Sequence, residues 1–456
     1  MKKSLFALAA IGAVAGSAQA QSSVTVYGVV DLGYGGSNVR SANQATANTG
    51  ATSGAIATGT QSSFTGDAES TSRLGFKGNE DLGGGLSAFF TFEQKVTPNG
   101  TAGAFNGTNG DGTRQAFVGL KKNGVGQFAF GTQYTTIFNA AAQSDPGMLN
   151  NMGGNVIYDK FAGYATQAGV QNSTTGAGTA VTMTAASFNT SGMQNNTSFI
   201  VRQANMLSFA TETFSGIQGN AYYVLNNKNS NATAGGATYN GGYSGGTDNH
   251  TAWGLGANYT WQKLFVTANY QNATDRNPYI MNTNGTYASG APVQGGFGGS
   301  VLAGTNSKDN QQYYAATYDF GILKAYVQYV NRKTSDYNNS ANYVSRTAQQ
   351  IGVRSFITPT VESWASVGTG RLGYGTAGGA SGTATTNTYN AASSTIGTNT
   401  ANFGGFQLGT NYWLSKRTNL YAIFGQQRTS NQNWVLNGNP TSYNMNDYAV
   451  GVRHTF

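Results

Sequence analysis

The chain has 456 residues, of which 65 are glycine, 26 tyrosine, 24 phenylalanine and none cysteine. Charged residues make up only 9%, against roughly 25% in an average soluble protein. The mean hydropathy of −0.33 is too polar for a helical membrane protein, and the longest apolar run, residues 5–16, is shorter than the ~18 residues of a spanning helix. With 12% aromatic residues the composition is not that of a disordered chain either. A large, glycine- and aromatic-rich all-β protein remains.

An export signal is predicted at the start of the chain. Two lysines, Lys2 and Lys3, precede the apolar run, and Ala18-Gln19-Ala20 supplies the small-x-small pattern of a cleavage site. We therefore predict a cleaved signal peptide over residues 1–20. No repeat of fixed period follows, which predicts a single domain over residues 21–456.

The lack of cysteine and the scarcity of histidine exclude several chemistries. Without thiols the chain has no thiol nucleophile and no thiolate metal ligand. Its two histidines, His250 and His454, lie about 200 residues apart in sequence, which is poor material for a zinc site or a histidine-based triad. We expect no catalytic residues, no metal and no cofactor. After removal of the signal peptide, 23 basic and 17 acidic residues leave a net charge of +6.

Period-two alternation recurs along the chain from Val24 onward. In residues 251–259, Trp253, Leu255 and Tyr259 share one face, and small or polar side chains share the other. Such alternation is the strand pattern, because successive side chains of a strand point to opposite faces. A soluble sandwich would give the same alternation, so this pattern alone leaves both architectures open.

The lengths of the connections distinguish the two architectures. The gaps between the predicted strands alternate between short turns and long, low-complexity loops, and an even number of strands of about ten residues joined in this way is typical of an outer-membrane barrel. We predict sixteen strands, over residues 24–34, 70–78, 84–94, 113–121, 126–133, 197–211, 216–226, 250–261, 263–272, 311–320, 322–333, 346–356, 361–370, 402–414, 417–429 and 443–456.

Several segments carry a resemblance to a known family. Residues 24–31 (VTVYGVVD), 72–78 (SRLGFKG) with 80–85 (EDLGGG), 114–120 (RQAFVGL), 130–134 (FGTQY) and the end of the chain, 448–456 (YAVGVRHTF), follow one another in the order of matching segments in the general bacterial porins. These are trimeric outer-membrane diffusion channels of Gram-negative bacteria. The matches run from residue 24 to 456, so the resemblance covers nearly the whole mature chain.

The resemblance implies a fold, a location and partners. The fold is all-β, a 16-stranded antiparallel transmembrane β-barrel with short periplasmic turns, long extracellular loops and an inward-folded third loop. The chain would lie in the outer membrane of a Gram-negative bacterium as a homotrimer, in contact with outer-membrane lipids and lipopolysaccharide. It would pass ions and small hydrophilic solutes, and it would be inserted by the barrel-assembly machinery. No nucleic acid partner is expected.

The resemblance also implies a pore constriction in which arginines on the barrel wall face acidic groups on the third loop. Arg73 and Lys77 share a strand face, opposite Leu74 and Phe76, and pointing them to lipid would cost about 2–4 kcal/mol each near the bilayer midplane. Both are therefore expected to point into the lumen, although Lys77 near a turn also suits a solvated interfacial lysine. Two more wall candidates come from the resemblance. These are Arg114, whose alternation with Ala116, Val118 and Leu120 would not send it inward, and Arg202, which also suits a solvated rim position.

The third loop, residues 134–196, supplies the facing side of this predicted constriction. Asp145 matches one of the acidic positions of the family's loop, and Asn151 and Asn155 stand where enteric members carry further acids. Asp31 and Glu93 share parity with lumenal positions and are expected to line the pore away from its narrowest part, or to form rim salt bridges. Three cations facing about one carboxylate predict a modest anion preference.

The last strand and the early strands carry two further predictions. Tyr448, Val450, Val452 and Phe456 fall on one apolar face, and by resemblance the terminal Phe456 is part of the signal read by the assembly machinery. The pairs Gly28/Val30 and Phe117/Gly119 are predicted to form flat outer faces that suit a neighbouring subunit.

Competing functions come from other classes. An adhesin or phage-receptor barrel would use the long loops, and conductance would separate it from a channel. An outer-membrane barrel enzyme would need a nucleophile, a base and an orienting group, and no such set is evident. A sugar-specific channel is a variant of the channel hypothesis, which the many tyrosines do not decide.

Overall fold

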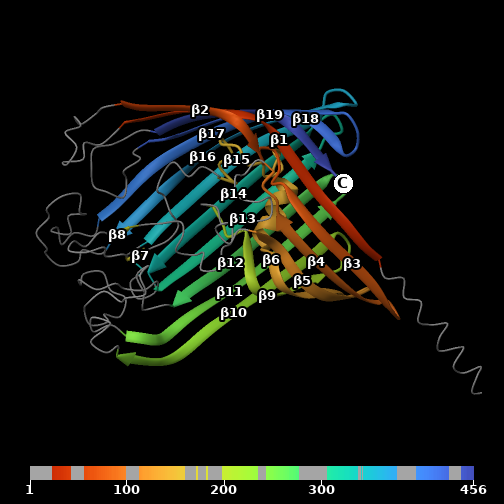
Figure 1. The fold of residues 1–456 in the computed structure, drawn as a ribbon, viewed down its shortest axis with the longest axis vertical. Helices are drawn as coiled ribbons and strands as arrows, with labels where there is room; N and C mark the ends of the chain where they lie inside the picture. Colours follow the sequence, from red (N-terminus) through yellow and green to blue (C-terminus); the bar gives the residue numbers. More distant parts are fainter. Residues whose placement is uncertain are drawn as a thin grey trace, which may run out of the picture.

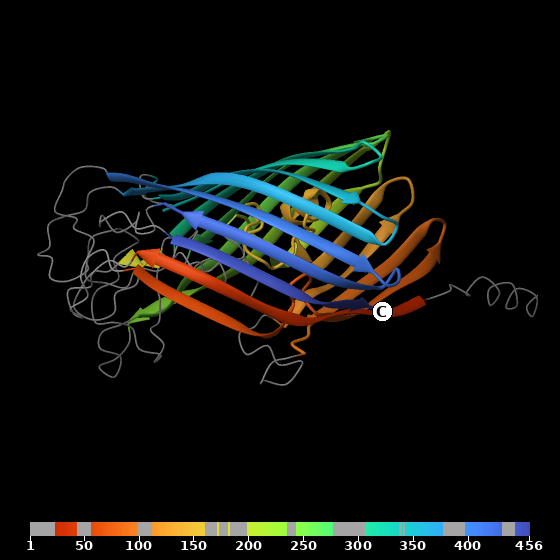
Figure 2. The ribbon, with the colours of Figure 1, turned by 90° about the horizontal axis from the view of Figure 1, so that it is seen from above.

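The computed structural model is a barrel whose strands tilt steeply around a lumen (Figure 1). The short turns gather at the end of the barrel where the C-terminus lies, as Figure 2 shows. The structure describes residues 23–42, 56–98, 112–159, 171–172, 181–182, 198–234, 243–276, 306–336, 340, 343–376, 397–430 and 443–456. The predicted signal peptide lies outside these residues.

One antiparallel sheet of seventeen strands makes the barrel, and a separate two-residue ribbon pairs β7 (Gln171–Asn172) with β8 (Val181–Thr182). Sixteen strands of the sheet form a closed ring, because β1 pairs with β19 as well as with β3. The ring strands are β1 (Ser23–Ala42), β3 (Arg73–Gly83), β4 (Leu86–Lys95), β5 (Thr113–Lys122), β6 (Gly126–Tyr134), β9 (Arg202–Thr211), β10 (Ile217–Ala234), β11 (Tyr243–Trp261), β12 (Leu264–Arg276), β13 (Asn306–Asp319), β14 (Lys324–Asp336), β15 (Tyr343–Phe356), β16 (Val361–Thr376), β17 (Gly397–Trp413), β18 (Thr418–Thr429) and β19 (Tyr443–Thr455).

The seventeenth strand, β2 (Ile56–Gly66), continues the line of β3 along the edge of β1. The first half of β1 pairs with β3 and its second half, from Leu32 onward, pairs with β2. Residues 67–72 interrupt this line as a bend, in which Asp67 has a φ of 70° and Ser72 is fully buried. The second barrel strand is therefore broken in two, with a short inward segment between the halves.

The predicted architecture is confirmed. Each of the sixteen predicted segments overlaps one ring strand, and the short turns fall where the sequence put them. Left-handed glycines make one such turn possible, since Gly83, Gly84 and Gly85 have φ values of 84°, 61° and 76° between β3 and β4. The main difference is in extent, because β1, β2, β10 and β11 reach into segments that were predicted to be loops.

The outer face of the barrel carries large apolar side chains. Val118, Phe130, Leu255 and Ile351 are each more than half exposed, as suits a surface that meets lipid or another subunit. The prediction that Phe117 and Gly119 form part of this outer face is wrong. Phe117 lines a cavity inside the barrel, and Ala116, Val118 and Leu120 take the outer positions of β5.

The end of the chain closes the ring. The Phe456 amide donates to Gly28 O and the Gly28 amide donates to Phe456 O, each over 3.1 Å. The Phe456 ring lies over Gly28, where an added Cβ would come within 2.3 Å of the ring. A side chain larger than hydrogen at position 28 would therefore push the terminal ring off the barrel.

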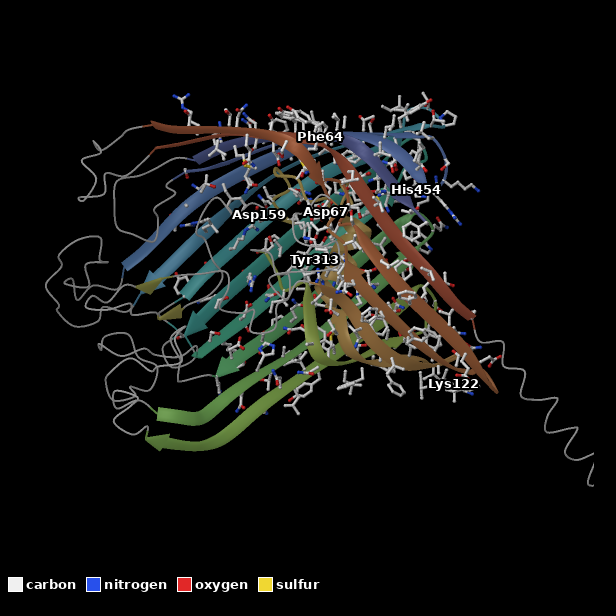
Figure 3. The ribbon with its side chains drawn as sticks, viewed as in Figure 1. Phe64, Asp67, Lys122, Asp159, Tyr313 and His454 are labelled. Carbon is white, nitrogen blue, oxygen red and sulfur yellow. The ribbon has the colours of Figure 1, made fainter. Side chains whose placement is uncertain are left out.

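The third loop enters the barrel as a short helix, α2 (Thr136–Ser144), seen inside the ring in Figure 2. No helix in the described part of the chain combines the length and apolar character needed to cross a membrane. Tyr313 is fully buried and is hydrogen-bonded to Ser144 of α2, whereas Phe64 is exposed on the outer surface (both labelled in Figure 3).

Candidate pore constriction

Helix α2 is held against the wall by its own sequence pattern. Thr135 caps it, accepting a hydrogen bond from the Phe138 amide over 3.3 Å, while its hydroxyl donates to Ile200 O over 2.7 Å. Ile137, Ala140 and Ala141 are buried on helix α2, which packs mainly against β12 and β13, so the third loop is fixed at its entry.

Six inward-facing glutamines hold the rest of the loop, and we call them the glutamine row. The Gln350 side chain accepts from the Val156 amide over 3.1 Å, and Gln407 donates to Asn150 Oδ1 over 2.9 Å and to Gly153 O over 3.1 Å. An amide suits this role because it both donates and accepts without adding charge. The row consists of Gln271, Gln311, Gln328, Gln350, Gln407 and Gln427, all at most 2% exposed.

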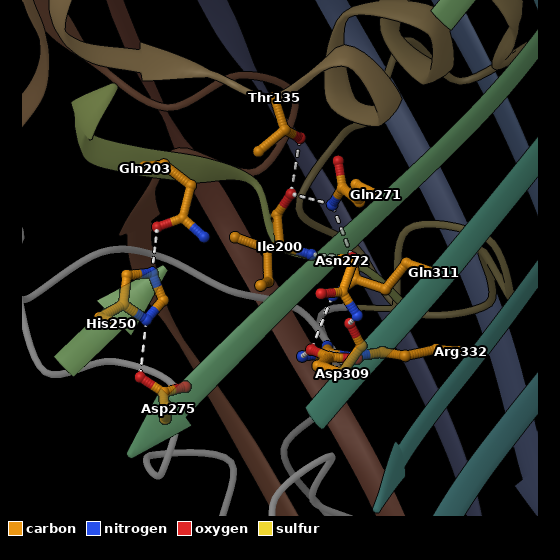
Figure 4. A network of polar contacts seen from close by, with 10 residues as sticks. All are labelled: Thr135, Ile200, Gln203, His250, Gln271, Asn272, Asp275, Asp309, Gln311 and Arg332. Carbon is orange, nitrogen blue, oxygen red and sulfur yellow. Dashed lines mark hydrogen bonds and ion pairs between the residues drawn. The ribbon is translucent and has the colours of Figure 1, made fainter. Parts of the chain in front are cut away.

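Figure 4 shows how this row grips the return of the loop toward β9. Gln311 accepts from the Ile200 amide over 2.8 Å, and Gln271 donates to Ile200 O over 3.3 Å. Beside it, Arg332 Nη2 and Asp309 form a buried ion pair at 2.6 Å. Helix α2 at the start of the third loop and Ile200 at its return are thus both bound to the same wall of the barrel.

Glycines on the same wall let the loop backbone lie flat against it. A Cβ built at Gly405 would come within 2.6 Å of Gly154 O, and one at Gly425 would come within 2.0 Å of Gly153 O. These contacts are with backbone, which cannot rotate away, so any larger residue would displace the loop.

The opposite side of the lumen is charged. Arg114 Nε lies 2.6 Å from Glu93 Oε1, and Arg73 Nη1 lies 3.9 Å from the same oxygen. Tyr134 accepts from Arg114 over 2.7 Å and Tyr27 donates to Glu93 over 3.1 Å. Arg73, Arg114 and Arg202, together with Glu93, form what we call the arginine cluster.

A β-bulge explains why Arg114 points inward. On β4, Glu93 and Gln94 are adjacent, but on β5 their partners are Gln115 and Thr113, so Arg114 is the extra residue. A bulge of this kind shifts side-chain parity by one position. The shift puts Arg114 on the lumenal side, while Val118 on the same strand stays 59% exposed on the outside.

The other wall candidates lie in the same region. Arg202 is 2% exposed, with its guanidinium 5.6 Å from the centre of the Tyr134 ring. Lys77 is exposed to the lumen, and its ammonium lies 5.5 Å from the centre of the Tyr27 ring. The structure therefore brings all four predicted wall cations to β3, β5 and β9.

Asp145 and Asn155, which were predicted to face these cations, are instead buried within the third loop. Asp145 is 2% exposed and accepts from the Leu149 amide over 2.9 Å and from Asn155 over 2.8 Å. Burial raises the pKa of the Asp145 carboxyl, and these hydrogen bonds oppose that rise. Asn155 is also buried, and it accepts from the Ile157 and Tyr158 amides.

The inward bend of residues 67–72 adds a second loop segment that the sequence did not reveal. Asn151 of the third loop donates to Asp67 O over 2.6 Å, which joins the two segments. Asp31 is fully buried beneath the bend and accepts from the Glu69 and Ser70 amides over 2.8 and 2.7 Å. Asp67 Oδ2 in turn lies 3.9 Å from Lys95 Nζ, next to a cavity of about 690 Å³.

Among the described residues, no group of three or more histidine, aspartate or glutamate side chains could hold a metal ion. His250 instead sits between Asp275 and Gln203, at 2.6 and 3.1 Å (Figure 4).

The fold and this site define a class of protein, a transmembrane β-barrel with an internally folded third loop. The sequence profile of the Gram-negative porins matches residues 7–432, and the chain belongs to that family. It is therefore an outer-membrane protein.

Curated relatives match over part of their length. Outer membrane porin protein 32 of Delftia acidovorans is 45% identical over 107 residues, which cover 23% of this chain and 26% of that protein. Major outer membrane protein P.IB of Neisseria meningitidis serogroup B is 38% identical over 131 residues, covering 29% and 33%. The matched stretches thus span less than half of these relatives.

Solved structures share the fold over nearly the whole chain. An anion-selective porin from Comamonas acidovorans has a TM-score of 0.56 at 18% identity, covering 96% of this chain and 100% of that one. The trimer form of OmpT from Vibrio cholerae has a TM-score of 0.51 at 12% identity, covering 95% and 99%.

Proposed function

We propose that the protein forms a water-filled channel through which ions and small hydrophilic solutes diffuse passively. The observation that carries this proposal is the third loop, fixed to one wall by the glutamine row and facing charges on the other. A loop held in this way narrows a lumen without moving to open or close it. The family relatives are porins, and we propose no enzymatic activity.

We propose further that the channel prefers anions modestly. Three guanidinium groups and one carboxylate leave the arginine cluster with a formal charge of +2. The Asp145 carboxylate is turned into the loop, where amides surround it, so it opposes this charge less than an exposed acid would. In water one unit charge at about 4 Å is worth about 1 kcal/mol, or roughly a fivefold bias. The anion-selective porin of Comamonas acidovorans supports the same direction.

The test is the zero-current potential of the purified protein in planar bilayers across a salt gradient. We expect conductance, with a potential of the sign given by anion permeation, and a bias that weakens as salt rises. A barrel without conductance would refute the channel. A cation-selective channel would keep the channel and refute the preference.

We propose a homotrimer as the assembly. Gly28, covered by the Phe456 ring, and the exposed Val30 leave a flat outer patch on β1 that suits a neighbouring subunit. The solved trimer form of OmpT shares the fold. Unheated gel electrophoresis and light scattering in mild detergent should both give three chains, and a monomer in both would contradict the assembly.

Phe456 is proposed to act in insertion by the barrel-assembly machinery. Its deletion also removes two backbone hydrogen bonds to Gly28. Comparing deletion of Phe456 with Phe456→Tyr separates the roles, because the second variant keeps the backbone pairing and an aromatic ring. We expect insertion in cells to fall for the deletion and to be retained by Phe456→Tyr. Undiminished insertion of the deletion variant would refute this role. We also propose that the outer face of the barrel contacts lipopolysaccharide and other outer-membrane lipids.

A further inference from the structure

A cavity of about 360 Å³ lies inside the barrel between α2 and strands β5, β6, β9, β10 and β11. Its volume falls in the range of about 300–1,000 Å³ typical of small-molecule sites. Neutral amides dominate its walls, and among the described residues no lysine, arginine, histidine or acidic side chain lines it. The amides include Gln115, Gln127, Asn139, Gln143, Gln218 and Asn220.

Part of this amide lining is fixed and part is available to a solute. Gln133 is held in place, donating to Met206 O over 3.1 Å and accepting from Ser208 over 2.7 Å. Within the described part of the chain, the side chains of Gln115, Gln127 and Asn220 make no hydrogen bond to another protein group. These three amides come from three different strands, so they can reach one molecule from several directions.

An aromatic surface completes the cavity. Phe117 lines it and packs edge-on against Phe89, with ring centres 6.3 Å apart and an interplanar angle of 78°. Phe117 lies two residues from Gln115 on the same face of β5. A solute here would meet hydrogen-bonding amides next to an apolar ring.

This combination selects a chemical class. Hydroxyl groups both donate and accept, as amides do, and a cavity without charge offers an ion nothing in return for lost hydration. The C–H faces of a sugar ring can cover an aromatic side chain. We propose that the cavity is a binding site for neutral polyhydroxylated solutes, the class of small sugars, beside the constriction. This inference rests on the proposed channel function.

The arginine cluster adjoins this cavity. Tyr134 lines the cavity and accepts a hydrogen bond from Arg114, so the charged and the neutral surfaces meet at one side chain. Anions and neutral sugars would then follow adjacent paths through one lumen.

The experiment is titration of maltose into a bilayer that holds the open channel, with a polyethylene glycol of equal hydrodynamic size as the control. Binding predicts a saturable and reversible fall in conductance with maltose, and only a gradual, non-saturating fall with the polymer. Equal responses to both would overturn the inference while leaving the channel itself intact. A lack of conductance would instead refute the proposed function.

Variants locate the site. The double variant Gln127→Leu/Asn220→Leu removes two available amides, and we expect its half-saturating maltose concentration to rise about tenfold. Gln61→Leu is the matched control, since Gln61 lines the separate cavity beside β2, and its half-saturating concentration should equal that of the unaltered protein. An unchanged half-saturating maltose concentration in the double variant, or an equal shift in the Gln61→Leu control, would overturn the inference. The single variant Gln127→Leu, at an exposed position, gives the same readout with about a threefold shift if the double variant inserts poorly.

Discussion

Two opposite walls of the lumen have different roles in this protein. On β3, β4, β5 and β9, the arginine cluster concentrates charge, with Glu93 between Arg73 and Arg114. On β12 to β18, the glutamine row and glycines such as Gly405 hold the third loop, together with Arg346, which donates to Val156 O over 2.8 Å and is paired with Asp159 at 3.2 Å. The difference separates the parts that set the field from the parts that set the width.

Anchoring without unpaired charge has a physical advantage here. Unpaired charges beneath the loop would add their own field to the pore, whereas Arg346 is paired with Asp159 and Arg332 with Asp309, which offsets the desolvation of these buried charges. Amide hydrogen bonds contribute about 0.5–1.5 kcal/mol each, and several together help to hold the loop without adding charge. The two walls can therefore be altered independently, which makes the comparison testable.

The largest effect is expected from a side chain inserted beneath the loop. Gly405→Val places a Cβ within 2.6 Å of Gly154 O, so the loop must move into the lumen. Overpacking costs about 1–3 kcal/mol, and we expect conductance to fall by roughly half. Single-channel recording checks this.

The neighbouring residue is the control. Gly404 points to the outer face, where an added Cβ meets only Gly368 O at 3.4 Å. Gly404→Val should leave conductance unchanged. Equal conductance in the two variants would show that the loop does not rest on the glycines.

The second prediction concerns the carboxylate of the charged wall. Glu93→Gln raises the formal charge of the arginine cluster by one, so the preference for anions should increase, roughly fivefold at most. Conductance should change little, because the loop anchors are on the other wall. Permeability ratios from zero-current potentials measure the first effect, and a decrease in anion preference would contradict the assigned field.

The third prediction separates two arginines by stability. Arg114 pairs with Glu93 at 2.6 Å with both side chains buried, whereas the Arg73 side chain is 22% exposed. Breaking a buried pair costs about 3–5 kcal/mol. Arg114→Ser should therefore lower the unfolding temperature of the detergent-solubilised protein more than Arg73→Ser does. Equal losses would mean that the Arg114 pair adds nothing beyond the exposed one.

The smallest effect is expected from the loop carboxyl, through pH. Burial raises the pKa of Asp145, so the folded protein binds this proton more tightly than the unfolded chain. Stability from this group is then greatest at low pH and falls as pH rises through the raised pKa. Relative to Asp145→Asn, the unaltered protein should lose unfolding temperature on going from acid to neutral pH. A rise in the unfolding temperature over that pH range would contradict the raised pKa of Asp145.

The barrel could be predicted from the sequence because the features that define it are local. Alternation and turn length are properties of neighbouring residues, and each of the sixteen predicted strands is present. The inward direction of Arg73 could also be predicted, because Arg73 alternates with Leu74 and Phe76, which take the opposite face of the strand.

The bulge at Arg114 and the surroundings of Asp145 are not local in this sense. A bulge shifts parity without a mark in the sequence, so Arg114 points inward as the resemblance implied, against its alternation, and Phe117 lies inside instead of on the predicted outer face. Burial of Asp145 depends on Gln350 and Asn155, one of them on a distant strand. The inward bend that carries Glu69 lies at the end of residues 35–69, a low-complexity stretch for which the sequence predicts only a loop.

The central claim, that the arginine cluster sets the field of the constriction, is tested most directly by reversing one charge. Arg73 is the most exposed of its three arginines, and Arg73→Glu changes the formal charge of the cluster from +2 to 0. In a KCl gradient, the zero-current potential should show anion preference in the unaltered protein and should move to cation preference or to neutrality in Arg73→Glu. An unaltered protein that prefers anions, with the same potential in the variant, would contradict the account.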